Sequence, residues 1–322
     1  MNIQQAEEGL IGISIRENQV RMTEAVEEAG HFKITRVSKG GSRIPFSFSV
    51  VEDRSNIPLL AQDINRVYET AGFSSNKASL SLDSDLVLIK KIPVDASLEG
   101  DELREHVRWE VSQFMINPLD HFIVDYEELR KNGQQPGEAD VVVVVVRKVV
   151  IDFIKEIFAS TDLHLRAVDV DVFSAQRVLK HSFQFPPDAR IALVDLRKNN
   201  LQISVLHDSY FLSQEIAYPA EDAMTIDSNW EEHIARVISK ELRRIILDNK
   251  LGKSIEDLHK VFIYGDNVEN RMIEILSKSH NIPFHRINPF EKIPLISAPT
   301  EPEVQEHPES FVTSVGAAIR NL

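Results

Sequence analysis

Short apolar and alternating segments open both halves of the chain in the same order. In the first half they lie at residues 10–15, 20–22 and 32–37, and in the second half at 191–196, 201–206 and 210–217. Polar residues typical of turns separate the members of each set. Segments of this length that alternate, or are wholly apolar, are typical of β-strands. Each half is therefore predicted to begin with a three-stranded meander, and the recurrence indicates an internal duplication.

Apolar residues at helical spacing follow these strands. A stripe between residues 60 and 71 predicts a helix that ends near Gly72, and similar stripes lie at 103–114, 150–158 and 230–247. Residues 141–146, by contrast, are six consecutive valines, the pattern of a strand that is covered on both faces. Strands that alternate with helices in this way predict a layered α/β fold.

A proline pair and the order of the elements predict the domain organisation. Pro186 and Pro187 separate a first unit, 1–185, from a second unit, 186–322. A strand, helix and strand block at about 78–140 is predicted to be a small subdomain inserted into the first unit. The second unit is predicted to contain a helical subdomain at about 218–258, an exposed loop rich in Pro and Glu at 297–308, and a closing helix at 310–322 that packs back on the first unit.

Charge and composition restrict the partners. The 322 residues are 43% hydrophobic, enough for a large core, and 50 Asp and Glu outnumber 36 Lys and Arg to give a net charge of -14. Such a surface repels nucleic-acid phosphates and anionic lipid headgroups, so no nucleic-acid partner is expected. The densest basic group lies on one predicted helix among three glutamates, which is typical of a solvated face. Its members are Arg236, Lys240, Arg243 and Arg244.

Neither a disulfide nor a membrane-crossing segment is predicted. The chain has no cysteine, which excludes disulfides and thiolate metal sites and fits a reducing cytosol. Residues 1–8 lack the basic and apolar regions of a signal peptide. The longest aliphatic run, at 141–146, is far shorter than the roughly twenty apolar residues that a bilayer span needs. We therefore expect a cytoplasmic protein that reaches the membrane only through a partner.

Five segments and the closing helix resemble the PilM family of actin-like proteins, relatives of the cell-division protein FtsA. The most specific segment, 103–129, contains Glu-Val-Ser-Gln-Phe-Met-Ile-Asn-Pro-Leu at 110–119, and the next, 140–179, contains Ala-Val-Asp-Val-Asp at 167–171. The segments at 12–21, 192–206 and 261–287 correspond to actin-type nucleotide segments, and 315–320 to the closing helix. The resemblance implies an α/β, actin-like (ribonuclease H-like) duplicated fold of two lobes, with a small α+β subdomain inserted into the first lobe.

The nucleotide segments depart from the family pattern. Ser14 stands where an acidic residue helps to organise magnesium, and Arg16 where a glycine lets the backbone approach phosphate. In the second segment Asp195 is kept but Arg197 replaces a glycine, and in the adenosine segment only Gly265 remains of a glycine-rich turn. Binding of ATP through magnesium relies on oxygen ligands and backbone donors at these positions. No cofactor is therefore expected, and ATP with magnesium is the alternative.

Two other uses of these positions remain open. Four basic side chains could converge on a different anion in the old phosphate cleft. They are Arg16, Arg21, Arg197 and Lys198. The plainer alternative is that these side chains fill a closed cleft or pair with Glu17 and Asp195. Asp169 and Asp171, which like Asp195 lie near predicted strand ends, are expected to be caps or turn residues rather than catalytic groups.

The remaining candidate residues do not match any recognised catalytic or metal site. His106 and Glu110 lie one helical turn apart, a spacing that suits metal ligation, but with no third ligand evident a surface pair is favoured. His280 and His285 flank a predicted turn and belong to no nucleophile constellation. A sugar kinase is disfavoured because it needs a working phosphate site and a placed base. Neither a catalytic residue nor a metal site is predicted.

The resemblance also implies a function. In the PilM family the partner is PilN, whose cytosolic N-terminal tail lies between the inserted subdomain and the core of the first lobe. By family geometry, the groove here would draw on residues 78–92 and on the helix at 103–114. We therefore expect a cytosolic scaffold of a type IV pilus or type II secretion-like inner-membrane assembly, which binds a PilN-like tail without efficient ATP hydrolysis. The alternatives are an active ATP-binding switch of the same machine and a self-polymerising protein, a homo-oligomer.

Overall fold

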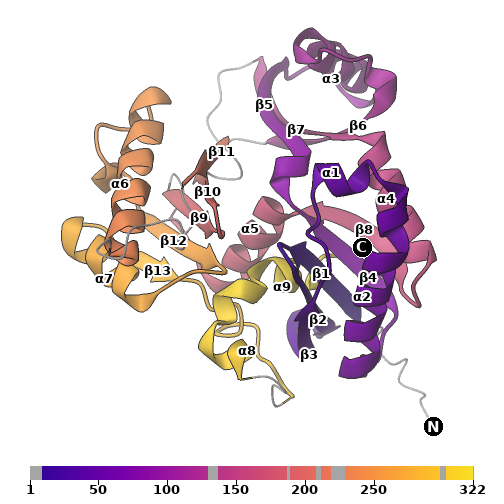
Figure 1. The fold of residues 1–322 in the computed structure, drawn as a ribbon. Helices are drawn as coiled ribbons and strands as arrows, with labels where there is room; N and C mark the ends of the chain where they lie inside the picture. Colours follow the sequence, from indigo (N-terminus) through magenta and orange to yellow (C-terminus); the bar gives the residue numbers. More distant parts are fainter. Residues whose placement is uncertain are drawn as a thin grey trace.

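The computed structural model describes residues 9–129, 137–186, 189–207, 212–218, 229–297 and 302–321. Within these residues the chain forms two five-stranded sheets, a smaller three-stranded sheet and the helices that cover them (Figure 1). Residues 1–8 and parts of the predicted strand 210–217, the Pro186–Pro187 boundary, the inserted block, the helical region 218–258 and the loop 297–308 lie outside the described residues.

The first sheet begins with the predicted meander. Its strands, in spatial order, are β3 (His31–Gly41), β2 (Gln19–Glu28), β1 (Leu10–Arg16), β4 (Lys77–Leu82) and β8 (His164–Val170). The first three strands run antiparallel, whereas β1, β4 and β8 are parallel to one another. Alternation along β1 places Ile11, Ile13 and Ile15 in a core that is covered by α1 (Phe48–Val51), α2 (Ile57–Ala71) and α4 (Lys148–Ala159).

The second sheet repeats the order of the first. Its strands are β11 (Leu212–Ala217), β10 (Asn200–His207), β9 (Arg190–Leu196), β12 (Lys260–Gly265) and β13 (Phe284–Arg286). An antiparallel meander is again followed by strands parallel to the first one. The helices α6 (Trp230–Asp248) and α7 (Asn270–Ser279) bury their apolar faces in this lobe's core. The predicted internal duplication is confirmed by this shared topology.

The inserted sheet carries the valine strand. It consists of β5 (Val87–Asp95), β7 (Glu138–Arg147) and β6 (Phe122–Leu129), with α3 (Gly100–Phe114) packed on one face. Val141, Val143 and Val145 are buried against α3. Val144, which points the other way, is only half-buried and lines a groove. The prediction that both faces of this strand are covered is confirmed, since Val142 and Val146 are also buried and only Val144 stays partly exposed.

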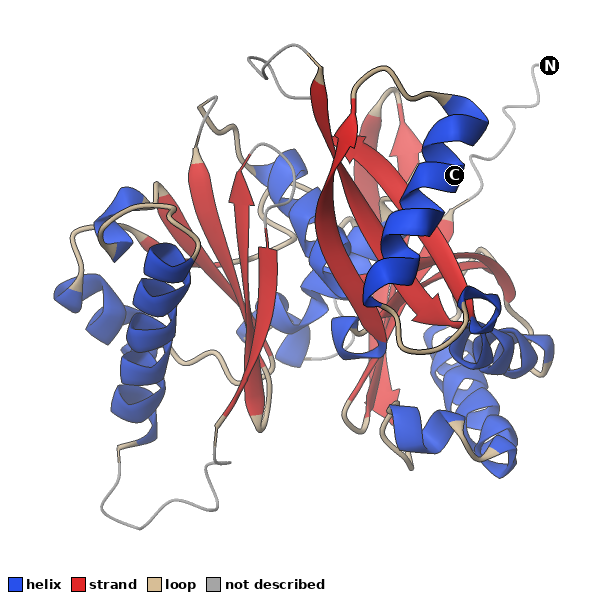
Figure 2. Ribbon diagram, turned by 90° about the horizontal axis from the view of Figure 1, so that it is seen from above, coloured by secondary structure: helices blue, strands red, loops and turns tan. Residues whose placement is uncertain are grey.

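The lobes are joined by a core that α5 (Asp171–Ser182) and α9 (Val312–Ala318) share with strands of both sheets, as Figures 1 and 2 show. Helix α9 lies so close to β1 that a Cβ on Gly12 would stand 1.9 Å from the carbonyl oxygen of Ser314, and one on Gly316 would stand 2.0 Å from that of Ser174 on α5. Part of the predicted exposed loop is instead a short helix, α8 (Glu303–Glu306), because Val304 is buried.

Candidate functional site

Charged residues of both lobes meet where the central strands end. Because β1, β4 and β8 are parallel, their carboxyl ends lie at one edge of the first sheet, and this brings together Arg16, Asp83 and Asp171. Asp195 and Arg197 lie at the corresponding end of β9 in the second sheet. We call these five side chains the interlobe cluster. Asp83 was not singled out from the sequence, although its place directly after β4 is a signal that could have identified it.

Arg16 bonds to carboxylates of both lobes. Its Nη1 donates to Asp195 Oδ1 at 2.9 Å, and its Nη2 donates to the second oxygen of the same carboxylate. Nη2 also donates to Asp171 Oδ2 at 3.0 Å, and Nε donates to Asp83 Oδ1 at 3.1 Å. The planar guanidinium of Arg16 is thus shared among three aspartates, one of them across the cleft.

Arg197 makes the reciprocal contacts. Its Nε donates to Asp195 Oδ2 at 3.2 Å, and its Nη2 donates to Asp171 Oδ2 at 2.7 Å and to Gln202 Oε1 at 3.1 Å. Ser84 closes the ring, because its backbone N–H donates to Asp171 Oδ2 and its hydroxyl donates to Gln202 Oε1. The exposed fraction of Arg16 is 4%, that of Arg197 8%, and those of Asp171 and Asp195 are 1% each. The charges are therefore compensated by one another, with little access to water.

The ionisation of the cluster reflects burial and pairing. Burial disfavours the charged Asp195 carboxylate, but Arg16 and Arg197 hold its pKa below the ordinary value. Burial raises the pKa of Asp171 to about 6, because the two arginines offset only part of the lost hydration. Burial also opposes the charge of Arg16, yet the three carboxylates raise its pKa well above the ordinary value. Two cations and three anions leave one negative charge, which proton uptake by Asp171 removes.

The other predicted site residues lie beside the cluster. The hydroxyl of Ser14 is buried on β1 without a hydrogen-bond partner in the described structure. Arg21, on β2, is 2.6 Å from Asp266 of the second lobe, whereas Lys198 donates its backbone N–H to the Glu17 carboxylate at 2.8 Å. Gly265 has a φ of +118°, and a Cβ there would stand 2.1 Å from the carbonyl oxygen of Leu196. Only glycine fits that turn.

The remaining candidates are not brought into one site. His106 Nε2 is 3.9 Å from Glu110 Oε1, and both side chains are about one-third exposed, so they form a surface pair. His280 shares a hydrogen bond with Ser239, whereas the His285 ring lies beside Phe262 on the adjacent strand. In the part of the chain that the structure describes, no group of three or more His, Asp or Glu side chains is arranged to hold a metal ion.

The structure also places the predicted basic residues of α6 and tests for a membrane-spanning helix. On α6, Lys240 and Arg244 both lie near Glu241, and Arg236 bonds to the backbone of its own helix. The four basic side chains are exposed, as on a solvated helix face, whereas Glu241 is buried. None of the described helices combines the length and the apolar character that crossing a bilayer requires.

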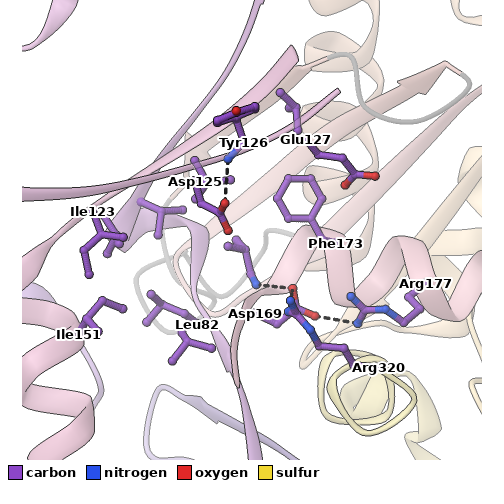
Figure 3. A pocket seen from close by; sticks show the side chains of 16 residues that line it. Leu82, Ile123, Asp125, Tyr126, Glu127, Ile151, Asp169, Phe173, Arg177 and Arg320 are labelled. Carbon is purple, nitrogen blue, oxygen red and sulfur yellow. Dashed lines mark hydrogen bonds and ion pairs between the residues drawn. The ribbon is translucent and has the colours of Figure 1, made fainter. Parts of the chain in front are cut away.

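A groove of about 530 Å³ separates the inserted sheet from the first lobe. Its apolar wall includes side chains of β4 to β8, α4 and α5 (Figure 3). They are Leu82, Val87, Ile123, Val142, Val144, Val146, Ile151, Val168, Val170 and Phe173. The expected segment 78–92 contributes Leu82 and Val87. The expected helix α3 contributes none of the lining residues, because it covers the opposite face of the inserted sheet.

The groove has charged groups at its rim. Arg177 donates to Asp169 Oδ2 at 2.7 Å and to the carbonyl oxygen of Gly316 at 2.6 Å, and Arg320 lies 3.3 Å from Asp169 Oδ1. Figure 3 shows both arginines pointing toward Asp169. Asp125 and Glu127, on β6, are exposed. The groove is therefore apolar along its floor, ion-paired on the side of α5, and acidic on the side of β6.

Comparisons with known proteins identify the family. A family profile described as type IV pilus assembly protein PilM matches residues 12–222. A solved structure described as a PilM-PilN type IV pilus biogenesis complex is similar, with a TM-score of 0.79 and 17% identity over 98% of each chain. A Bacteroides thetaiotaomicron protein with an actin-like ATPase fold and unknown function has a TM-score of 0.46 and 11% identity over 90% of this chain and 94% of that one. The cytoplasmic domain of EpsL, an inner-membrane component of the Vibrio cholerae type II secretion system, has a TM-score of 0.47 and 9% identity over 81% and 84%.

The fold and the profile agree with the resemblance seen in the sequence. The two-lobed, actin-like architecture with its duplicated sheets is confirmed. The profile spans well over half of the 322 residues. The chain therefore belongs to the PilM family of type IV pilus assembly proteins.

Proposed function

We propose that this chain is a cytoplasmic scaffold of a type IV pilus or related inner-membrane machine, and that it binds the cytosolic N-terminal tail of a PilN-like membrane protein. The tail would lie in the groove between the inserted sheet and the first lobe. The family membership and the similarity to a solved PilM-PilN complex support the choice of partner. Any association with the membrane would then come through that partner.

The groove beside the valine strand carries this proposal. Valines at alternate positions of β7 are buried by α3, whereas Val142, Val144 and Val146 turn toward the groove. A groove of about 530 Å³ is within the range of about 300 to 1,000 Å³ that is typical of ligand pockets. Apolar surface that is open at one side of a sheet commonly marks a binding site. An extended peptide with alternate apolar side chains is an occupant that suits such a channel.

Charge supports the same partner. Asp125 and Glu127 make one side of the groove acidic, and the chain as a whole carries a net charge of -14. Cytoplasmic segments next to a membrane span are enriched in Lys and Arg. A tail with apolar residues for the floor and basic residues near Asp125 and Glu127 would therefore be attracted to this site.

We also infer that docking proceeds without efficient ATP hydrolysis. The one carboxylate kept from the family's phosphate segments, Asp195, already accepts hydrogen bonds from Arg16 and Arg197. Catalysis of phosphoryl transfer depends on metal ions and donors placed around the phosphates. Here the side chains at the ends of β1 and β9 are engaged with one another.

The proposal is tested with a fluorescent peptide that carries the N-terminal tail of the PilN-like protein from the same cell. Two matched variants share a change from an exposed aliphatic residue to Glu. Ile123, 37% exposed, lines the groove, whereas Leu88, 42% exposed, does not. Ile123→Glu is expected to weaken binding by about tenfold or more, because a charge would enter the apolar floor. Leu88→Glu is expected to bind like the unmodified protein. No binding by the unmodified protein, or equal losses in both variants, would refute the proposal.

A further inference from the structure

The residues of the interlobe cluster do not fit a magnesium nucleotide. A phosphate cradle needs small residues so that consecutive backbone N–H groups can approach oxygen, but the long side chain of Arg16 extends from that position. A magnesium ion at Asp195 would have to displace two guanidinium groups that already bond to both carboxylate oxygens. A phosphate in the same place would meet the carboxylates of Asp83 and Asp171. The family's usual ligand and this set of side chains are therefore incompatible.

We propose that the interlobe cluster takes the place of the nucleotide and acts as a built-in tie that keeps the two lobes closed. The cross-lobe bonds are the evidence. Arg16 of the first lobe bonds to Asp195 of the second, and Arg197 of the second bonds to Asp171 of the first. Here the chain supplies both charges of each bridge itself.

Burial limits the screening of this tie. The side chains of the cluster are almost wholly shielded from water, so their attraction is weakly screened. Opening the lobes would separate Arg16 from Asp195 and Arg197 from Asp171, and each group would lose its compensating partner. Two further contacts cross the cleft nearby, from Arg21 to Asp266 and from Lys198 to Glu17. The closed arrangement is thus supported independently of any added ligand.

The cluster is connected to the groove through α5. Asp171 is the first residue of this helix, and Phe173 and Arg177 on the same helix line the groove. Asp169, just before the helix, receives the hydrogen bond of Arg177. The close contact between Gly316 and Ser174 fixes α5 against α9. The cluster therefore sets the position of one wall of the groove, and this last step rests on the proposed function of the groove.

The distance between the lobes can be measured directly because the chain has no cysteine. Spin labels are attached to cysteines introduced by Glu69→Cys on α2 and Ser277→Cys on α7, both at exposed positions on opposite lobes. Pulsed electron resonance then gives the distribution of distances between them. In the labelled protein with an unmodified cluster we expect one narrow distribution of distances, which millimolar Mg-ATP does not change. A distribution that narrows or shortens only when Mg-ATP is added would overturn the tie.

The cluster is then removed in the labelled protein. Arg16→Ala combined with Arg197→Ala is expected to broaden the distribution and to weaken peptide binding by about tenfold. Arg54→Ala is the matched control, because Arg54 forms an exposed ion pair with Glu156 and lies outside the cluster. Should the double variant not fold, Arg16→Lys keeps the charge but loses the two-pronged bond to Asp195, and a smaller broadening is expected. An unchanged distribution in the variant that folds would refute the tie.

The two proposals fail in different ways. If the unmodified protein does not bind the peptide, the proposed function of the groove is wrong, and the distance distributions still decide the tie. If the peptide binds equally well to the unmodified protein and to a cluster variant with broadened distances, the tie stands but its connection to the groove through α5 is refuted. Peptide binding that requires Mg-ATP would refute the proposal that the cluster takes the place of the nucleotide.

Discussion

The interlobe cluster and the groove are both built around β8 and the start of α5. They differ, however, in charge, in burial and in whether the chain itself fills them. The cluster is charged, buried and filled by the chain's own side chains. The groove is apolar, open, and has a volume of about 530 Å³. A site whose polar groups are paired internally has little to offer a ligand, whereas partly exposed apolar side chains such as Ile123 and Val144 gain free energy when a partner covers them. Both proposals rest on this contrast, in which the groove receives a partner and the cluster holds the lobes together.

Removing one arginine of the cluster should have the largest effect. Arg16→Ala would leave Asp83, Asp171 and Asp195 as buried carboxylates with too little positive charge beside them. We expect the free energy of unfolding to fall by about 3 to 5 kcal/mol, measured by urea denaturation. The control, Arg54→Ala at the exposed pair with Glu156, should change it by less than about 1 kcal/mol. Equal losses in the two variants would show that the cluster contributes no more to stability than an exposed ion pair does.

A substitution at the contact between α9 and α5 should have an intermediate effect on the free energy of unfolding. In Gly316→Ala the new Cβ would stand 2.0 Å from the carbonyl oxygen of Ser174, so α9 and α5 would have to move apart. We expect a loss of about 1 to 3 kcal/mol in the free energy of unfolding. Gly41→Ala is the control, since its new Cβ would have no neighbour closer than 3.9 Å. A stable Gly316→Ala protein would mean that the contact between α5 and α9 is looser than the structure indicates.

The free energy of unfolding should depend on pH through the carboxylates of the cluster. Burial raises the pKa of Asp171 from 3.8 to about 6, so the folded state holds a proton there that the unfolded state has lost. This group therefore makes stability fall as the pH rises from about 4 to about 6. The lowered pKa of Asp195 acts in the opposite direction, but only as the pH falls below its ordinary value of 3.8.

This pH effect can be isolated by comparison with Asp171→Asn, which has no proton to release. Between about pH 4 and pH 6 the unmodified protein should lose about 2 kcal/mol more stability than the variant. Thermal unfolding of both proteins across this range is the measurement. Parallel curves for the two proteins would show that Asp171 is not the group that takes up the proton.

The surface pair should have the smallest effect. His106 and Glu110 lie on α3, away from both regions, and their closest atoms are 3.9 Å apart. His106→Ala is expected to change the free energy of unfolding by less than about 0.5 kcal/mol and to leave peptide binding unchanged. A clear loss of peptide binding in this variant would place part of the binding surface on α3.

The pattern of the sequence was sufficient for the strands, the helices and the duplication, because alternation and helical spacing report which residues face a core. The valine run shows the limit of this reasoning. Six valines predict a strand with both faces covered, as found, but the pattern does not show that Val144 stays partly exposed and lines a groove. Family geometry, not the pattern of the sequence, led to the expectation that α3 lines the groove, whereas α3 packs on the other side of β7.

The candidate site was predicted only in part. Arg16 and Arg197 stood out because they replace glycines of the family pattern, and pairing with Asp195 was one of the interpretations left open. Asp83 gave only the weaker signal of its place directly after β4, and Gln202 gave none, since the roles of both arise from the meeting of two lobes that are far apart in the sequence. Likewise, Phe173 and Arg177 looked like ordinary residues of a core helix before the groove was seen.

The affinity of the unmodified protein for the tail peptide, measured by calorimetric titration in the absence and presence of Mg-ATP, tests the division between cluster and groove most directly. We predict the same dissociation constant in both titrations, and no heat of binding when Mg-ATP is added alone. Peptide binding that appears only with Mg-ATP, or clear binding of Mg-ATP alone, would contradict a cleft closed by the chain's own arginines and would restore a nucleotide-driven switch.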